Sequence, residues 1–182
     1  MTDPLALRFA STIRATRAGL TDALATRESA QTWLHTHTGR TVTLDEADHA
    51  ELIRLRQSVR ALFAKTVAPH PPSRADANAL PPFPEALDTV NRATAPVLRR
   101  LRWDETPSEL RTPTAVDQIR ALRAELADAA VDFFAGPELA QVRVCPAPRC
   151  VLYFLKRHPR QEWCSTACGN RARAARHYQA HT

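Results

Sequence analysis

The first 144 residues of this 182-residue chain contain no cysteine, and the whole chain has only four glycines. No stretch of about 18 consecutive apolar residues occurs, so a transmembrane helix is not expected. The opening segment MTDPLALRFAST has an acidic residue at position 3 and lacks the apolar core of a secretory signal. We therefore expect a cytoplasmic protein that makes no membrane contact, in a compartment where thiols are kept reduced.

Acidic residues are almost absent from the last 38 residues. Residues 145–182 contain seven Lys and Arg but a single acidic residue, whereas residues 1–144 contain 18 of each sign. The formal net charge of +6 therefore lies entirely on the C-terminal segment. A solvated basic tail would explain this charge alone, but the same segment also holds every cysteine of the chain. The coincidence indicates a small basic module with a stabilising device of its own.

Helical periodicity covers most of residues 1–140. Four segments repeat apolar side chains at helical spacing and are bounded by capping residues, proline or glycine. They are 26–39, with Thr26 as cap and Gly39 as stop; 43–68, with Thr43 as cap; 84–98, with Pro84 in the first turn; and 114–136, with Thr114 as cap and Gly136 as stop.

Two further segments indicate short β structure at most. The lead-in at 5–15 fits a short strand or an irregular apolar segment, and Leu101 and Trp103 fit one face of a short strand. We predict a mainly α-helical, multi-helical domain over residues 1–140 with at most a small β element. A separate module of a short β segment and a helix is predicted over 141–182.

The four cysteines follow the spacing Cys145-x4-Cys150-x13-Cys164-x3-Cys168. Two close pairs separated by a short loop suit four thiolates around one tetrahedral zinc ion, at Zn–S distances of about 2.3 Å. Four thiolates leave no open coordination position, so such a zinc ion is structural rather than catalytic. Two disulfides in a secreted protein, buried free thiols and a redox pair are the alternatives, although neither pair has the x2 spacing of dithiol enzymes.

The residues around the cysteines fit a zinc-stabilised module. Pro146 and Pro148 stiffen the first turn, and the apolar residues 151–154 predict a short strand. Ser165 is a candidate N-cap, which places Cys168 in the first turn of a helix, where a thiolate is favoured. A module of under about 40 residues rarely folds on its own core, and zinc binding supplies the missing free energy.

Two histidines offer a second, weaker metal motif. His35 and His37 lie in the sequence HTHTG, but no carboxylate lies within it. We interpret both as polar residues at the end of a helix.

The sequence CGNR, at residues 168–171, resembles the CGNR zinc finger. In that family two cysteines precede an apolar stretch, and a WCS…CGNR segment with a basic helix ends the chain. The counterparts here are CPAPRC, LYFLK and EWCSTACGNRARAARHY. The resemblance implies one zinc ion held by all four cysteines. The chain departs from the family pattern at Lys156, where aspartate is usual, and at Gln161 and Glu162, which replace paired arginines.

The upstream region is similar to the ABATE domain that usually accompanies this finger. The matching segments are LALRFASTI, DALATRESAQTWL and LRQSVRALF, and Asn91 stands where that domain usually has asparagine. Ser11 replaces the asparagine of the opening pattern. The resemblance implies a stress-induced transcription regulator whose helical domain senses a small-molecule inducer or forms a homodimer.

The first functional hypothesis is a DNA-binding transcription regulator. The predicted helix at 166–179 places Arg173, Arg176 and His177 at i, i+3 and i+4, so they share one face that suits phosphates or the major groove. Further phosphate contacts are predicted for the loop residues Lys156, Arg157 and Arg160, while support of the metal site is assigned to Asn170, Arg171 and Trp163.

Two other classes of function compete with this hypothesis. The basic helix face could simply be solvated, or the finger could be a zinc-stabilised module that binds protein or RNA. In that case Tyr153, Phe154 and Trp163 would pack rather than stack on bases. We do not expect an enzyme, because no nucleophile–base pair, phosphate loop or pair of acids has the spacing that such chemistry needs.

Overall fold

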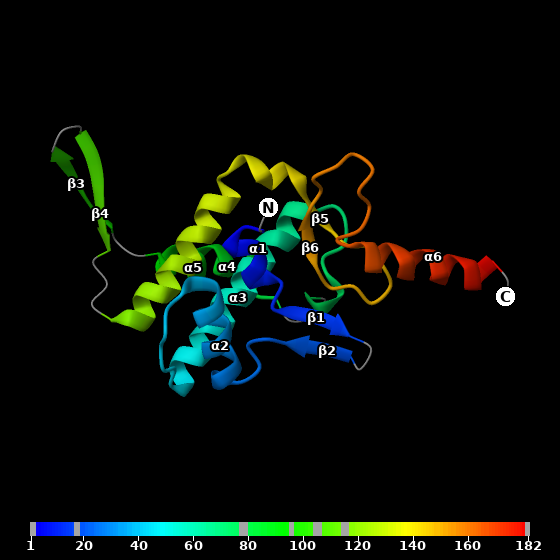
Figure 1. The fold of residues 1–182 in the computed structure, drawn as a ribbon, viewed down its shortest axis with the longest axis horizontal. Coiled ribbons are helices and arrows are strands. Elements are labelled where there is room, and N and C mark those ends of the chain that lie inside the picture. Colours follow the sequence, from blue (N-terminus) through cyan, green and yellow to red (C-terminus); the bar gives the residue numbers. More distant parts are fainter. Residues whose placement is uncertain are drawn as a thin grey trace.

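The computed structural model describes residues 3–16, 19–76, 80–94, 97–103, 107–113 and 117–180, with the backbone alone between 97 and 113. These residues form six α-helices and three two-stranded antiparallel hairpins (Figure 1). None of the described helices is both long and apolar enough to cross a membrane. The elements, in chain order, are α1 (Leu5–Ala10), β1 (Ile13–Thr16), β2 (Gly19–Asp22), α2 (Arg27–Thr38), α3 (Glu46–Val67), α4 (Phe83–Ala93), β3 (Val97–Trp103), β4 (Pro107–Pro113), α5 (Gln118–Phe134), β5 (Val142–Val144), β6 (Tyr153–Leu155) and α6 (Thr166–Ala180), with short 3-10 turns at Arg74–Asp76 and Pro137–Gln141.

The mainly helical class predicted from the sequence is confirmed, and the best-predicted helix is α2. Thr26 caps it, because its side-chain oxygen accepts a hydrogen bond from the Ser29 amide at 3.2 Å. The Ser29 hydroxyl oxygen accepts in return from the Thr26 amide at 3.1 Å. Gly39 follows the helix with φ of 73°, a left-handed conformation that favours glycine.

The prediction for residues 5–15 is wrong at its start, where a helix replaces the strand or irregular lead-in. Two adjacent pairs of residues in α1 are buried, whereas a strand would expose every second side chain. A short helix turns both pairs toward α3 and α5, against which it packs. The four buried residues are Ala6, Leu7, Phe9 and Ala10.

Thr43 does not cap α3, which begins two residues later than predicted. The N-cap is Asp45, whose carboxylate accepts a hydrogen bond from the Asp48 amide at 2.7 Å. Leu44 is buried and its amide donates to the side chain of Gln31 on α2 at 2.8 Å. Because this contact holds the chain extended against α2, the helix begins only after Leu44.

The other predicted helix ends also shift. α4 ends at Ala93, because the chain from Val97 onward forms β3, the strand that contains Leu101 and Trp103. Thr114 lies outside the described residues. Asp117 caps α5, with its carboxylate accepting from the Ile119 amide at 3.0 Å.

The main hydrophobic core surrounds α3 and extends into the C-terminal hairpin. The ring centroid of Phe63 in α3 lies 5.3 Å from that of Phe133, 4.8 Å from that of Phe134 and 5.3 Å from that of Tyr153 in β6. Val142 of β5 is buried in the same core. The packing therefore crosses the boundary that the sequence predicts between residues 140 and 141, and the division into two folding units stays a prediction.

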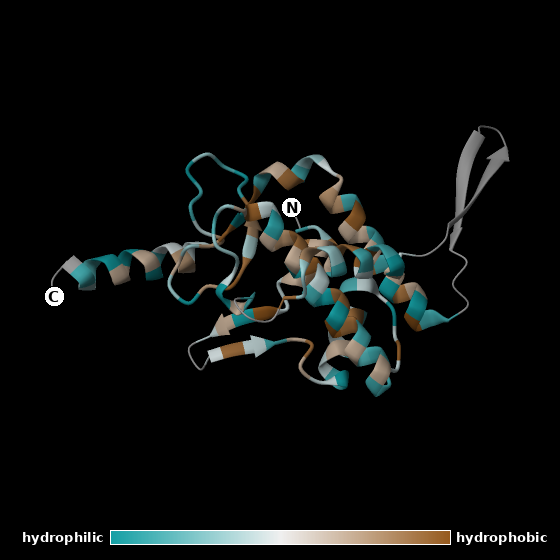
Figure 2. Ribbon diagram, turned by 180° about the vertical axis from the view of Figure 1, so that it is seen from behind, coloured by the Kyte–Doolittle hydropathy of each residue, from teal (hydrophilic) through white to brown (hydrophobic). Residues whose placement is uncertain are grey.

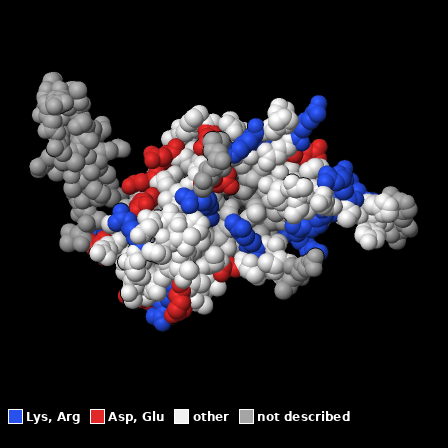
Figure 3. Space-filling view, in the orientation of Figure 1, with Lys and Arg blue, Asp and Glu red and all other residues white. Residues whose placement is uncertain are grey.

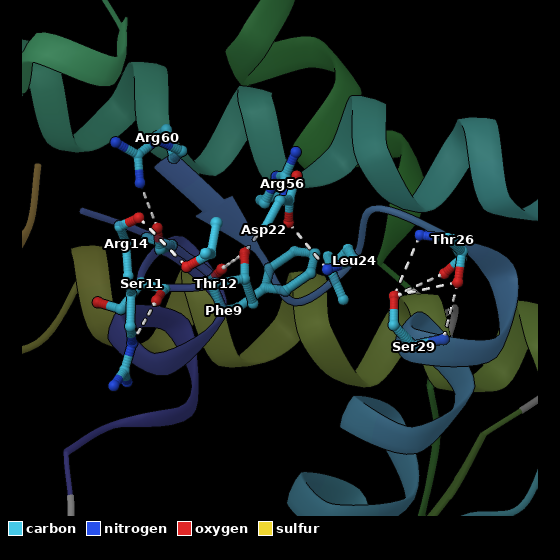
Figure 4. Close-up of polar contacts among 12 residues, drawn as sticks. Phe9, Ser11, Thr12, Arg14, Asp22, Leu24, Thr26, Ser29, Arg56 and Arg60 are labelled. Carbon is cyan, nitrogen blue, oxygen red and sulfur yellow. Dashed lines mark hydrogen bonds and ion pairs between the residues drawn. The ribbon is translucent and has the colours of Figure 1, made fainter. Parts of the chain in front are cut away.

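The hairpin β1–β2 is fixed to α3 by buried and partly buried polar contacts. Asp22 accepts hydrogen bonds from Arg56 at 2.5 Å and from the Leu24 amide at 2.8 Å (Figure 4). Arg56 also donates to the hydroxyl of Thr12 at 3.3 Å, and that hydroxyl donates to the Phe9 carbonyl at 3.0 Å. The end of α1 and the hairpin are thereby held on one side of α3.

Arg60, the next arginine along α3, is fully buried. Its guanidinium donates to Asp76 at 2.6 Å, to the hydroxyl of Ser73 at 3.1 Å, to the Val151 carbonyl at 3.3 Å and to the Ala10 carbonyl. A buried charge is stable only when it is paired and hydrogen-bonded, and here four residues from three segments supply the partners.

Tyr153 completes this network from β6. Its hydroxyl donates to Asp76 at 2.7 Å and accepts from the Ser73 amide at 3.2 Å. The Ser73 hydroxyl also donates to the Val151 carbonyl at 2.8 Å. The C-terminal hairpin is therefore joined to the helical part by hydrogen bonds as well as by apolar packing.

Replacing Arg60 by alanine should lower the free energy of unfolding by about 3–5 kcal/mol, because the Asp76 carboxylate would stay buried without its charge partner. Urea titration followed by circular dichroism measures this change. Arg92→Ala is the matched control, since Arg92 forms an exposed pair with Asp88 on α4. The control should change stability by less than about 0.5 kcal/mol. A loss below about 1 kcal/mol for Arg60→Ala would contradict the assignment.

Tyr153 should make stability fall at alkaline pH. Burial, followed by the nearby Asp76 carboxylate, raises the pKa of its hydroxyl above the ordinary value. The folded protein therefore keeps a proton that the unfolded chain loses above about pH 10, so this contribution is full below that pH and decreases above it. Urea unfolding at about pH 8 and about pH 11 should show the stability advantage over Tyr153→Phe shrinking by about 1.4 kcal/mol. An advantage that is equal at both pH values would be inconsistent with this pKa.

Candidate metal centre

The four cysteines come from a turn and from the start of a helix. Cys145 directly follows β5 and its amide donates to the Leu152 carbonyl at 3.0 Å, which extends the β5–β6 pairing. Cys150 ends the turn that leads to β6. Cys164 and Cys168 lie on either side of the first residue of α6.

The turn between the first two cysteines reverses the chain tightly. Arg149 has φ of 60°, the one positive value for a residue other than glycine within the described ranges. The Cys150 amide donates to the Ala147 carbonyl at 3.0 Å. The left-handed residue and this hydrogen bond return the chain so that both sulfurs face the same point.

The four sulfur atoms have the spacing that one zinc ion requires. All lie within 4.8 Å of one another, with Cys150 Sγ 3.7 Å from Cys164 Sγ and Cys164 Sγ 3.5 Å from Cys168 Sγ. Sulfurs placed about 2.3 Å from a tetrahedral zinc ion would be about 3.8 Å apart. All four are free thiols, so the alternative of two disulfides is not seen. The donor set and its geometry therefore fit a structural zinc ion.

Hydrogen-bond donors and a positive charge lie around Cys168 at the start of α6. The Ser165 hydroxyl accepts a hydrogen bond from the Cys168 amide at 3.3 Å, as an N-cap does. The sulfur therefore lies at the end of the helix where the dipole is positive. The guanidinium of Arg171 donates to Cys168 Sγ at 3.5 Å and adds a positive charge beside it.

The thiols of the cluster share their protons unequally. The pKa of Cys145 is lowered, chiefly because its sulfur accepts a hydrogen bond from Cys150. The pKa values of Cys150 and Cys164 are raised, chiefly by their hydrogen bonds to Cys145. Without a metal ion, Cys150 and Cys164 therefore keep their protons more strongly than an ordinary cysteine does. A bound zinc ion offsets the charge of four thiolates and closes the fold of the finger.

Trp163 packs against the start of α6. A Cβ atom at Gly169 would lie 3.0 Å from Cε3 of this indole, so the absence of a side chain allows the close approach. Trp163 also packs on the small cluster of buried residues that contains the cysteines. Asn170 accepts a hydrogen bond from Arg173 at 2.6 Å, so its described contact is with a basic residue of α6.

Two of the residues predicted to contact nucleic acid lie over the indole ring of Trp163. The guanidinium carbons of Arg173 and Arg176 lie 5.7 Å and 5.9 Å from its ring centroid. Both side chains are exposed. His177 is exposed one residue further along α6, with its ring centroid 6.2 Å from that of Tyr178.

The loop residues are placed differently from one another. Arg157 forms ion pairs with Asp3 at 3.3 Å and Glu138 at 4.0 Å, so it faces the helical part of the protein. Arg160 is exposed, whereas Lys156 is half-buried and lines a groove. The six predicted residues therefore do not share one set of contacts. Sequence reasoning missed the groove, whose other cations, Arg143 and Arg74, lie 13 and 82 positions before Lys156 in the chain.

The two histidines of HTHTG have ordinary structural partners. The ring of His37 stacks on Trp33 with centroids 4.3 Å apart, and its Nδ1 lies 2.9 Å from the Trp33 carbonyl. His35 Nδ1 lies 3.2 Å from the Thr41 hydroxyl. Among the residues with described side chains, the cysteine cluster is the group suited to a metal ion.

A four-cysteine metal centre at the base of a basic helix defines a zinc-finger protein. The family comparisons agree with this class: residues 141–181 match the CGNR zinc finger. Residues 3–137 match ABATE, a family described as a putative stress-induced transcription regulator. The chain belongs to the ABATE family, and its finger holds one structural zinc ion. A search of curated proteins finds no match.

Protein purified without added metal should contain about one zinc ion per chain by elemental analysis. Cys168→Ser should lose it, because three thiolates no longer close the tetrahedral site, and chelation should lower the thermal midpoint of the intact protein. The double variant His35→Ala, His37→Ala is the control and should keep its zinc. Loss of zinc from the double histidine variant, with zinc retained by Cys168→Ser, would contradict this assignment of the site.

Proposed function

We propose that this protein is a DNA-binding transcription regulator and that α6 is its main DNA-contacting element. The position of α6 carries the proposal. The helix projects away from the rest of the molecule in both ribbon views (Figures 1 and 2). Its 15 residues span about 22 Å, which suits insertion into a major groove.

The surface of α6 is polar and basic rather than apolar. Figure 2 shows no continuous hydrophobic stripe along the helix beyond its base. Basic side chains gather over the end of the molecule that carries α6, while acidic ones gather toward the far end (Figure 3). The whole net charge of +6 belongs to residues 145–182. Such a surface favours a polyanion by releasing its counterions.

Stacking on Trp163 prepares Arg173 and Arg176 for phosphate binding. An arginine held over an aromatic ring loses less side-chain entropy when it binds, since its position is already restricted. Both guanidinium groups remain exposed, so their N–H groups can meet phosphate oxygens. His177 and the loop residue Arg160 are further candidate contacts.

The remaining parts of the proposal concern the helical region. We assign it the role of sensing a small-molecule inducer or forming a homodimer, in a cytoplasmic protein that is not an enzyme. The alternative is a zinc-stabilised module that binds protein or RNA without sequence-specific DNA binding. The hydrogen bond from Arg173 to Asn170 uses one N–H group of the guanidinium and leaves the others for either kind of partner.

Binding of zinc-loaded protein to duplex DNA of about 20 base pairs should weaken with salt, with a log–log slope of about three to five. The double variant Arg173→Ala, Arg176→Ala should bind more weakly and reduce that slope by up to about two, with zinc content unchanged. Fluorescence anisotropy at several salt concentrations measures both quantities.

The matched control removes two exposed arginines from α2 and α3, as Arg27→Ala, Arg54→Ala. It has the same net charge as the test variant and should keep the parental slope. Equal binding by the test variant and the parent would exclude α6 as the contact surface. Tight binding to single-stranded RNA or an acidic peptide, with none to duplex DNA, would favour the interaction module.

A further inference from the structure

A groove separates the end of α3 from the zinc finger. Its volume is about 850 Å³, within the range of small-molecule sites. One wall is formed by residues 66–72 and Arg74, and the other by residues 142–146; Lys156, Gln161 and Glu162 also line the groove. Cys145 and Cys150 also line it, so the groove borders the metal centre.

Three cations from separate segments line this groove: Arg74, Arg143 and Lys156. None of them forms an ion pair with a carboxylate among the residues whose side chains are described. Arg143 donates to the carbonyls of Ala140 at 2.9 Å and Val142 at 2.6 Å, which holds its side chain in place. Its charge is left without a described acidic partner.

One acidic residue, Glu162, also lines the groove, so the lining keeps a net positive charge. An anionic ligand is therefore favoured over a neutral or cationic one. Lys156 is half-buried, and a charge–charge contact there is screened less by solvent than one on the open surface.

Much of the groove lining is apolar and stiff. Pro69, Pro71, Pro72 and Pro146 line it and are exposed, and the buried Phe154 also lines it. Proline fixes its own backbone, so the groove is largely formed before a ligand arrives. Apolar walls beside unpaired cations match a molecule with an apolar body and an anionic end.

We propose that this groove binds an amphiphilic organic anion, a small molecule with a carboxylate, sulfonate or phosphate group on an apolar body. The inference goes beyond the proposed function and stands whether or not α6 binds DNA. The apolar walls favour a small molecule with one anionic end over the nucleic-acid backbone, which carries a charged phosphate at every nucleotide. A ligand in this position would contact both the end of α3 and the loop that precedes the third cysteine.

Fluorescence titration of the full-length, zinc-loaded protein with anilinonaphthalene sulfonate tests the proposal. The probe should bind saturably at one site, decanoate should displace it, and decanol or inorganic sulfate at the same concentration should not. Arg74→Ala, Lys156→Ala should weaken binding roughly five- to thirtyfold, because each lost charge pair contributes up to about 1 kcal/mol. Glu162→Gln removes the opposing charge and should tighten binding about two- to fivefold.

Three controls keep the result specific to the groove. Arg27→Ala, Arg54→Ala tests the loss of charge elsewhere, and Phe83→Ala tests the exposed apolar surface of α4; both should bind the probe like the parent. Zinc content and the thermal midpoint confirm that each variant is folded. If the double variant fails to fold, Glu162→Gln still tests the proposal, because it is expected to bind the probe more tightly than the parent.

Three results would overturn the proposal. One is the absence of saturable binding, and another is equal affinity for the probe in the parent, the double variant and Glu162→Gln. The third is displacement of the probe by duplex DNA, with Arg74→Ala, Lys156→Ala lowering DNA affinity as much as Arg173→Ala, Arg176→Ala does. That last result would make the groove part of a nucleic-acid surface. Failure of α6 to bind DNA, with probe binding intact, would remove only the proposed function.

Discussion

The buried guanidinium of Arg60 is the interaction on which the arrangement of the chain depends. It is fully inaccessible to water and donates to α1, to the turn after α3 and to the residue that follows the second cysteine. A charge in this place is tolerated only because every one of these segments is in position. The network therefore favours one arrangement of the segments, whereas apolar packing alone would tolerate several.

This network also determines how the finger is attached. Val151 follows Cys150 directly, and its carbonyl accepts from both Arg60 and Ser73. Tyr153, two residues on, inserts its ring into the helical core beside Phe63. The metal centre is thus only one residue away from this buried polar network. Loss of the metal would therefore be expected to disturb the packing of the helical core, because Cys150 and Val151 are adjacent in the chain.

Local signals in the sequence identified the features that depend on neighbouring residues. Thr26 and Gly39 bound α2 as predicted, Ser165 caps α6, and the cysteine spacing located the metal centre. Features that depend on distant contacts were not predictable in this way. α1 is helical because its adjacent apolar pairs meet α3 and α5, and a six-residue segment is too short for its periodicity to show this. Arg74 and Arg143 line one groove although 69 positions separate them in the sequence.

The helix α6 is attached to the rest of the protein near its N-terminal end. The helix is secured at its first turn, by Cys168 and by the contact of Trp163 with Gly169, and extends outward from there. A rotation of the helix about this end would therefore displace its far end. For a helix of this length, a tilt of about 10° corresponds to a displacement of about 4 Å, roughly the spacing of one base pair. A small change in the positions of the four sulfur atoms that tilted α6 would thus produce a larger displacement at the C-terminal end of the helix.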